Sequence, residues 1–101
     1  MKQPLCNINE IPEEGSIIVP FFGREVHVYK VSGVPKAVAN VCLHFGGPLE
    51  YKEGKFICPW HGAEYSMEDG QRLTAPAPSK SRLMFLSTIV DDDVLNYVWG
   101  D

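Results

Sequence analysis

The chain has 101 residues, of which 45% are hydrophobic and 22% charged, a composition typical of a small globular protein. We therefore predict a single domain over residues 1–101 with a modest core. The net charge of −4 argues against a nucleic-acid partner, which selects a basic surface. Three cysteines cannot all form disulfides, and no apolar run reaches the length of a membrane span. We expect a soluble protein of a reducing, cytoplasmic compartment without a membrane anchor.

Hydrophobic residues recur in short runs separated by turn residues, a pattern typical of β-strands. The predicted strands cover residues 17–19, 25–31, 37–41, 56–57, 64–67, 83–90 and 94–99, with turns at 21–24, 32–35, 68–71 and 91–93. Pro20 is expected to close the first of these strands. No stretch has a helical period, so the predicted fold class is all-β, a small antiparallel sandwich or barrel.

One histidine and one cysteine, His27 and Cys6, lie outside any motif. In the second predicted strand, Val26 and Val28 alternate with His27 and Tyr29, which predicts a strand with one buried face. His27 is therefore expected at the surface or lightly packed. Cys6 is expected to be a small, buried apolar residue.

Two tight pairs of metal-binding residues stand out: Cys42 with His44, and Cys58 with His61. Residues two apart in an extended segment point to the same side, and residues three apart meet across a turn, so each pair can converge. Four nitrogen and sulfur donors indicate either zinc or an iron–sulfur centre. Zinc fingers more often pair Cys with Cys and His with His, whereas one Cys and one His from each loop suit two metal atoms.

The sequences around the donors, CLHFGGPL from Cys42 and CPWHGAEY from Cys58, resemble the cluster-binding loops of Rieske proteins. This resemblance implies one 2Fe–2S cluster, with one iron held by Cys42 and Cys58 and the other by His44 and His61. It also implies the small antiparallel Rieske-type sandwich, with a cluster-binding subdomain formed by the two loops. Thirteen residues separate His44 from Cys58, a few fewer than is usual, which we interpret as a shortened hairpin tip at 51–55.

The residues beside the expected ligands indicate the subtype. Membrane-bound, high-potential Rieske proteins have two further cysteines there, and Gly47 and Trp60 occupy those positions in this chain. The resemblance therefore implies that the loop disulfide is absent. High-potential members also have a serine and a tyrosine that bond to sulfur; Ala63 replaces the serine, whereas Tyr65 retains the hydroxyl. Loss of one donor predicts a low potential, and simple packing is an equal alternative for Tyr65.

The resemblance implies a soluble ferredoxin and not an enzyme. It would carry single electrons from a flavin- or iron–sulfur-containing reductase to a terminal oxygenase, most often a non-haem iron enzyme acting on aromatic compounds. The sequence has no nucleophile with an adjacent base and no phosphate-binding loop, so no catalytic residue is predicted. Two alternatives stay open: a small Rieske-like subunit of an assimilatory nitrite reductase, and a zinc-stabilised interaction module.

Overall fold

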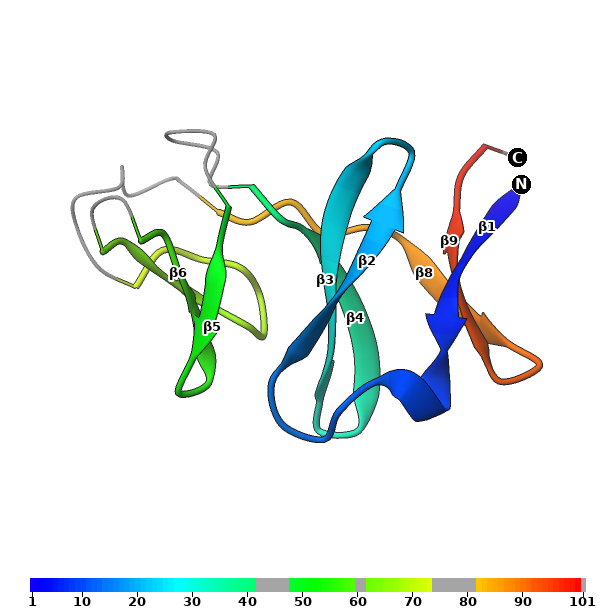
Figure 1. The fold of residues 1–101 in the computed structure, drawn as a ribbon, viewed down its shortest axis with the longest axis horizontal. Helices are drawn as coiled ribbons and strands as arrows, with labels where there is room; N and C mark the ends of the chain where they lie inside the picture. Colours follow the sequence, from blue (N-terminus) through cyan, green and yellow to red (C-terminus); the bar gives the residue numbers. More distant parts are fainter. Residues whose placement is uncertain (42–47, 60–61, 74–81, 101) are drawn as a thin grey trace. The chain divides into compact units, whose positions relative to one another are not determined.

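The computed structural model of the chain describes residues 1–41, 48–59, 62–73 and 82–100. The chain divides into two compact units: unit 1 comprises Met1–Ala39 and Phe85–Asp101, and unit 2 comprises Asn40–Met84 (Figure 1). In the described ranges, nine strands and one short 3₁₀ helix are present, and the strands form three antiparallel sheets. The predicted all-β class is confirmed. No helix in these ranges is long and apolar enough to cross a membrane.

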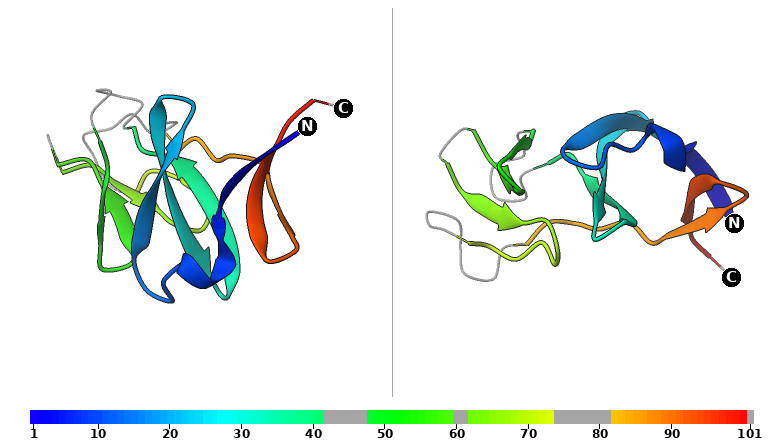
Figure 2. Two further views of the ribbon diagram at one scale, coloured as in Figure 1. Left: turned by 45° about the vertical axis from the view of Figure 1, so that its right-hand side comes forward. Right: turned by 90° about the horizontal axis from the view of Figure 1, so that it is seen from below.

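The first sheet of unit 1 brings the two ends of the chain together. It has the order β1-β9-β8 and consists of β1 (Lys2–Asn7), β9 (Val94–Val98) and β8 (Thr88–Asp91). The antiparallel pairing of β1 with β9 places the first and last strands side by side (Figure 2). After β1, the 3₁₀ helix η1 (Ile8–Glu10) begins with a capping box. The Asn7 side chain accepts the Asn9 N–H, and the Glu10 carboxylate accepts the Asn7 backbone N–H.

The second sheet of unit 1 has the order β2-β3-β4, with β2 (Ser16–Phe21), β3 (Arg24–Val31) and β4 (Val34–Ala39). The prediction that Pro20 closes the first strand is wrong, because β2 continues through Pro20 to Phe21. In this sheet β2 is bonded to β3 alone, and such a strand tolerates proline where the missing N–H would face away from the partner. The predicted turn at 32–35 is also too long, since β4 already begins at Val34.

Tight two-residue turns join four pairs of consecutive strands in the described ranges. Phe22 and Gly23, between β2 and β3, have φ angles of +49° and +79°. Positive φ at both central residues is typical of the type I′ turn, whose twist matches that of the flanking strands. The same pattern occurs at Ser32–Gly33, Glu53–Gly54 and Asp92–Asp93. Hairpin turns within the predicted segments 21–24, 32–35, 51–55 and 91–93 are therefore confirmed.

The core of unit 1 lies between its two sheets. Val19, Val26, Val28 and Ala37 of the β2-β3-β4 sheet form one buried cluster with Leu95 of β9 and with Ile11. The opposite face of β3 is buried as well, because His27 is only 3% exposed and Tyr29 is fully buried. The prediction of a surface or lightly packed His27 is thus wrong. As the middle strand of its sheet, β3 is covered on both faces, and alternation of polar with apolar residues does not reveal this.

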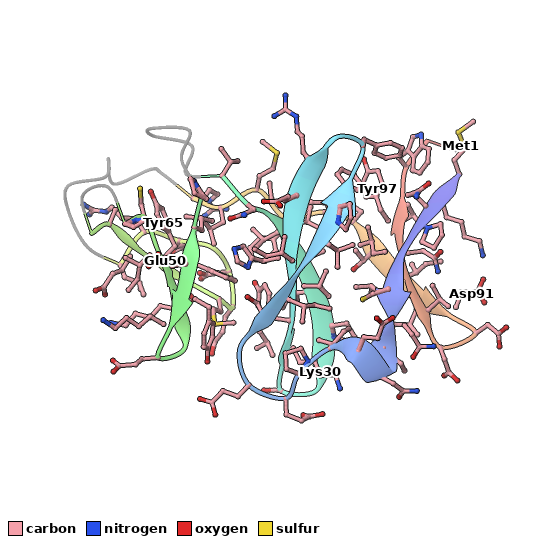
Figure 3. All side chains as sticks on the ribbon, viewed as in Figure 1. Met1, Lys30, Glu50, Tyr65, Asp91 and Tyr97 are labelled. Carbon is pink, nitrogen blue, oxygen red and sulfur yellow. The ribbon has the colours of Figure 1, made fainter. Side chains whose placement is uncertain are left out.

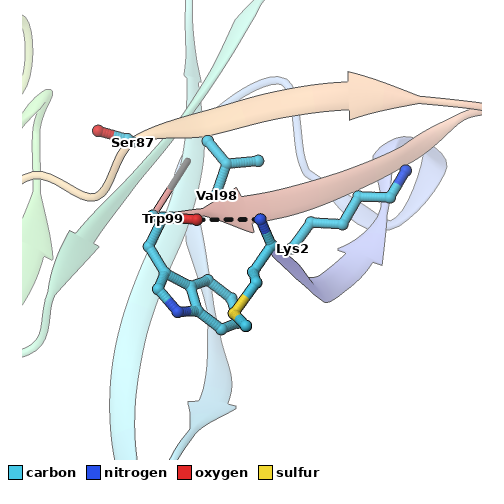
Figure 4. A pocket seen from close by; sticks show the side chains of 6 residues that line it. Lys2, Ser87, Val98 and Trp99 are labelled. Atoms are coloured by element: carbon cyan, nitrogen blue, oxygen red, sulfur yellow. Dashed lines mark hydrogen bonds between the residues drawn. The ribbon is translucent and has the colours of Figure 1, made fainter.

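Aromatic rings gather where the β2–β3 hairpin meets the end of β9. The ring centroids of Phe21 and Tyr97 are 4.9 Å apart, and Tyr97 stacks on Trp99 at 5.2 Å (Figure 3). The Met1 ammonium donates a hydrogen bond of 3.0 Å to the carbonyl of Trp99, beside a shallow surface pocket (Figure 4). These contacts fix both chain ends to the same edge of unit 1.

The buried Tyr29 makes the stability of the fold sensitive to alkaline pH. Burial raises the pKa of Tyr29 above the ordinary value of 10.0. A raised folded-state pKa leaves stability intact below about pH 10 and removes it as the pH rises further, by at most about 1.4 kcal/mol per pH unit. We expect the unfolding free energy of Tyr29→Phe, measured by urea titration, to fall less steeply than that of the wild type between about pH 9 and pH 12. This range covers the ordinary tyrosine pKa and the values above it. Equal slopes for the two proteins would contradict this.

Unit 2 contains a third sheet built from very short strands. Its order is β5-β6-β7, with β5 (Glu50–Lys52), β6 (Lys55–Ile57) and β7 (Glu64–Ser66). Phe56 in β6 pairs with both Tyr51 and Tyr65, the latter labelled in Figure 3. Phe56 and Tyr65 are at most 1% exposed. Among the described residues of this unit, the other buried apolar side chains are those of Leu49, Cys58, Ala63, Met67 and Leu83. Unit 2 is thus a small core around one hairpin and its neighbouring strand.

Candidate metal centre

The second cysteine–histidine loop begins where β6 ends. Cys58 directly follows Ile57, and its side chain is fully buried. The Cys58 N–H donates to the Ala63 carbonyl at 2.9 Å, and the Gly62 N–H donates to the Cys58 carbonyl at 2.8 Å. Gly62 has a φ of +76°, a conformation that favours glycine and lets the chain turn back into β7. Two backbone bonds therefore close the base of this loop.

The first cysteine–histidine loop lies between β4 and β5. Here the loop is closed by a side chain, because the Leu49 N–H donates a hydrogen bond of 2.8 Å to Oδ1 of Asn40. Asn40 comes directly after β4, and Leu49, 3% exposed, comes directly before β5. Sequence reasoning did not single out Asn40. An asparagine at the end of a strand and before a glycine-rich loop is a signal for such a bond, since its short side chain readily reaches nearby backbone groups.

Of the four predicted ligands, the structure describes one. Cys58 is described and buried, whereas Cys42, His44 and His61 lie outside the described residues, so the set of four stays a prediction. Both loops belong to unit 2. Across the described part of the chain, no three His, Cys, Asp or Glu side chains gather as a competing metal site.

The third histidine and the third cysteine belong to unit 1 and have structural surroundings of their own. Nδ1 of His27 and Oγ of Ser16 are 2.8 Å apart and share a hydrogen bond. Cys6 is half-buried and packs against the core cluster of unit 1. Burial, followed by the nearby carboxylate of Glu10, raises the pKa of the Cys6 thiol. The protonated thiol that results is a poor metal ligand.

The described surroundings of Cys58 fit an iron–sulfur centre. A buried cysteine at the end of a strand, in a loop closed by backbone hydrogen bonds, provides a thiol held in place and removed from water. Two such thiolates with two imidazoles are the donor set of a Rieske-type 2Fe–2S cluster. Ala63 and Tyr65 follow in the same loop and strand, both at most 1% exposed, so Tyr65 has a buried position close to Cys58 in sequence.

Comparison with known families identifies the class of protein. The Rieske [2Fe-2S] domain family matches residues 1–92, which include parts of both units. The chain belongs to the Rieske [2Fe-2S] family, and its cofactor is a 2Fe–2S cluster.

Among known proteins, iron–sulfur subunits of cytochrome b6-f complexes are similar in sequence. A subunit from Synechocystis is 42% identical over 57 residues, which are 54% of this chain and 31% of that protein. The subunit of Microcystis aeruginosa is 35% identical over 80 residues, which are 72% of this chain and 44% of that protein. The chain therefore spans less than half the length of either relative.

Solved structures share the fold over nearly the whole chain. A ferredoxin of Sphingomonas yanoikuyae B1 superposes with a TM-score of 0.80 at 17% identity, covering 99% of this chain and 100% of that one. A plasma-membrane Rieske protein of Synechocystis PCC 6803 superposes with a TM-score of 0.79 at 27% identity, covering 96% of this chain and 99% of that one. The terminal oxygenase of carbazole 1,9a-dioxygenase from Novosphingobium sp. KA1 gives 0.79 at 25% identity, covering 99% of this chain and 30% of that one. These likenesses confirm the Rieske-type fold.

Proposed function

We propose that this chain is a Rieske-type ferredoxin, a one-electron carrier and not an enzyme. In this proposal Cys42 and Cys58 bind one iron of the cluster, and His44 and His61 bind the other. The single observation that carries the proposal is the family match over residues 1–92, which includes all four donors in the expected order. The buried Cys58 and the hydrogen bonds that close both loops support it.

The donor set accounts for the range of the reduction potential. The bound cluster would take up and release one electron. Neutral imidazoles in place of two thiolates remove negative charge, which raises the potential to roughly −150 to +300 mV, against about −400 mV with four thiolates. The chain adds no serine hydroxyl at Ala63, so a potential in the lower part of this range follows. His44 and His61 would each keep a second ring nitrogen that can hold a proton.

We propose further that the electron acceptor is a terminal oxygenase and the donor a reductase, and that the carrier is soluble and cytoplasmic. Support comes from the full-length likeness in fold to a ferredoxin and from the likeness to the terminal oxygenase of carbazole 1,9a-dioxygenase. Both units would act together as one Rieske domain over residues 1–101, since the family match crosses from one to the other. The net charge of −4 suits docking to a basic partner surface.

Purification of the protein under reducing, anaerobic conditions tests the proposal. We expect a brown protein with about two irons per chain and, after reduction, a paramagnetic resonance of low average g that is typical of mixed thiolate and imidazole ligation. A colourless protein that contains one zinc would refute the electron-carrier proposal and support the zinc-stabilised interaction module. A fixed stoichiometric complex on native purification would instead support a permanent subunit, as in nitrite reductase.

The role of Tyr65 can be measured as a shift in potential. If its hydroxyl donates to a sulfur, Tyr65→Phe removes a bond worth about 1 kcal/mol and lowers the potential by about 40 mV for a one-electron couple. Tyr51→Phe removes the same atom from β5, whose Tyr51 pairs with Phe56, and serves as the matched control. Redox titration of the two variants gives the answer. No shift in Tyr65→Phe would make Tyr65 a packing residue.

A further inference from the structure

The two ligand loops of unit 2 are closed by different kinds of bond. The second loop is closed by backbone groups, from Cys58 to Ala63 and from Gly62 to Cys58. At the first loop, the Oδ1 atom of Asn40 accepts the Leu49 N–H at 2.8 Å, across nine positions of the sequence. A side chain is thus part of the closure of one loop, and a substitution can remove that bond without altering the backbone.

The bond joins two fixed points of the fold. Asn40 is half-buried and follows the last residue of β4, whereas Leu49 is 3% exposed and belongs to the buried core of unit 2. Residues 41–48 lie between them and include Cys42 and His44. Holding the two ends of a loop together removes part of the conformational entropy that a metal would otherwise have to overcome when it gathers its ligands.

We propose that Asn40 is a positioning residue for the cluster, acting through the loop that carries Cys42 and His44. The inference rests on the proposed ligand set. Asn40 itself need not touch iron or sulfur. Its side-chain oxygen Oδ1 accepts the Leu49 N–H, and this bond holds together the two residues that flank the segment with the proposed ligands. Loss of the acceptor frees these two residues, which raises the entropic cost of keeping both ligands on the metal and speeds release of iron to a chelator.

The test compares three variants of the iron-loaded protein. Asn40→Ala removes the acceptor, and Asn40→Asp keeps an oxygen in the same place. Asn7→Ala is the matched control, because Oδ1 of Asn7 also accepts a backbone N–H, that of Asn9, at 2.8 Å, but in unit 1. We expect Asn40→Ala to release iron to a ferrous chelator about fivefold faster than wild type, the factor typical of one lost hydrogen bond. Asn40→Asp and Asn7→Ala should release iron at nearly the wild-type rate.

A spectroscopic measurement separates positioning from simple stability. Loosened ligands should broaden the paramagnetic resonance of the reduced Asn40→Ala protein, while Asn7→Ala lowers the melting temperature and leaves the line shape unchanged. The proposal would be overturned if Asn40→Ala released iron at the wild-type rate with the wild-type line shape. It would also be overturned if Asn40→Asp released iron as fast as Asn40→Ala. Should Asn40→Ala not fold, Asn40→Leu removes the acceptor and keeps a side chain of similar size, and wild-type release by that variant would overturn the proposal equally. Wild-type protein that binds no iron would instead refute the proposed function.

Discussion

Replacement of His44 or His61 by alanine is expected to abolish the Rieske-type spectrum of the protein. In the proposed ligand set, each substitution removes one of two imidazoles from the same iron, and neither alanine nor water supplies a comparable nitrogen donor. We expect loss of most of the bound iron, or conversion to a cluster with a different visible spectrum and a higher average g. Iron content, visible circular dichroism and resonance of the reduced state measure the outcome.

The third histidine provides the control for this experiment. His27 is buried in β3 of unit 1 and bonds to Ser16, so His27→Gln should reduce stability but leave the cluster spectrum of the folded fraction unchanged. An unchanged spectrum in His44→Ala or His61→Ala would show that the assigned ligands are wrong. Loss of the spectrum in all three variants would indicate general unfolding, which the melting curves of the variants reveal.

Removal of the iron is expected to loosen unit 2 far more than unit 1. The strands of unit 2 have three residues each, and a short sheet of this kind is marginal without additional support. Unit 1 has strands of four to eight residues and a core shared by two sheets. Because the cluster would join both loops of unit 2, its binding energy adds directly to the folding of that unit.

Hydrogen exchange of the iron-loaded and iron-free proteins measures this difference. We expect the amides of β5, β6 and β7 to lose at least about tenfold in protection in the iron-free protein, which corresponds to about 1.4 kcal/mol. The amides of β3 and β9 should change little and serve as the internal control. Equal loss of protection in both units would show that the protein unfolds as one cooperative body, and equal retention would show that unit 2 is stable without metal.

Local patterns in the sequence predict seven of the nine strands in the described ranges, with errors at their boundaries, and they miss β1 and β5. Three of the four two-residue hairpin turns have a glycine at their second position, which adopts positive φ without strain. As expected, β6 ends at Ile57 and leads into Cys58. The strand end predicted at Pro20 is wrong because a proline rule taken in isolation ignores which edge of the strand is bonded. The turn predicted at 32–35 overlaps the first two residues of β4. The strand predicted at 83–90 is shorter in the structure, where β8 covers Thr88–Asp91.

The sequence alone determined the class of protein, because two short motifs, each with a cysteine and a histidine beside glycines and prolines, resemble the cluster-binding loops of the Rieske family. Only the tertiary structure decided which residues outside the cysteine and histidine pairs are buried or bonded. Burial of His27 requires cover on the second face of β3, and the bond from Leu49 to Asn40 joins two residues nine positions apart. Periodicity along one strand carries no information about contacts that its residues make outside that strand.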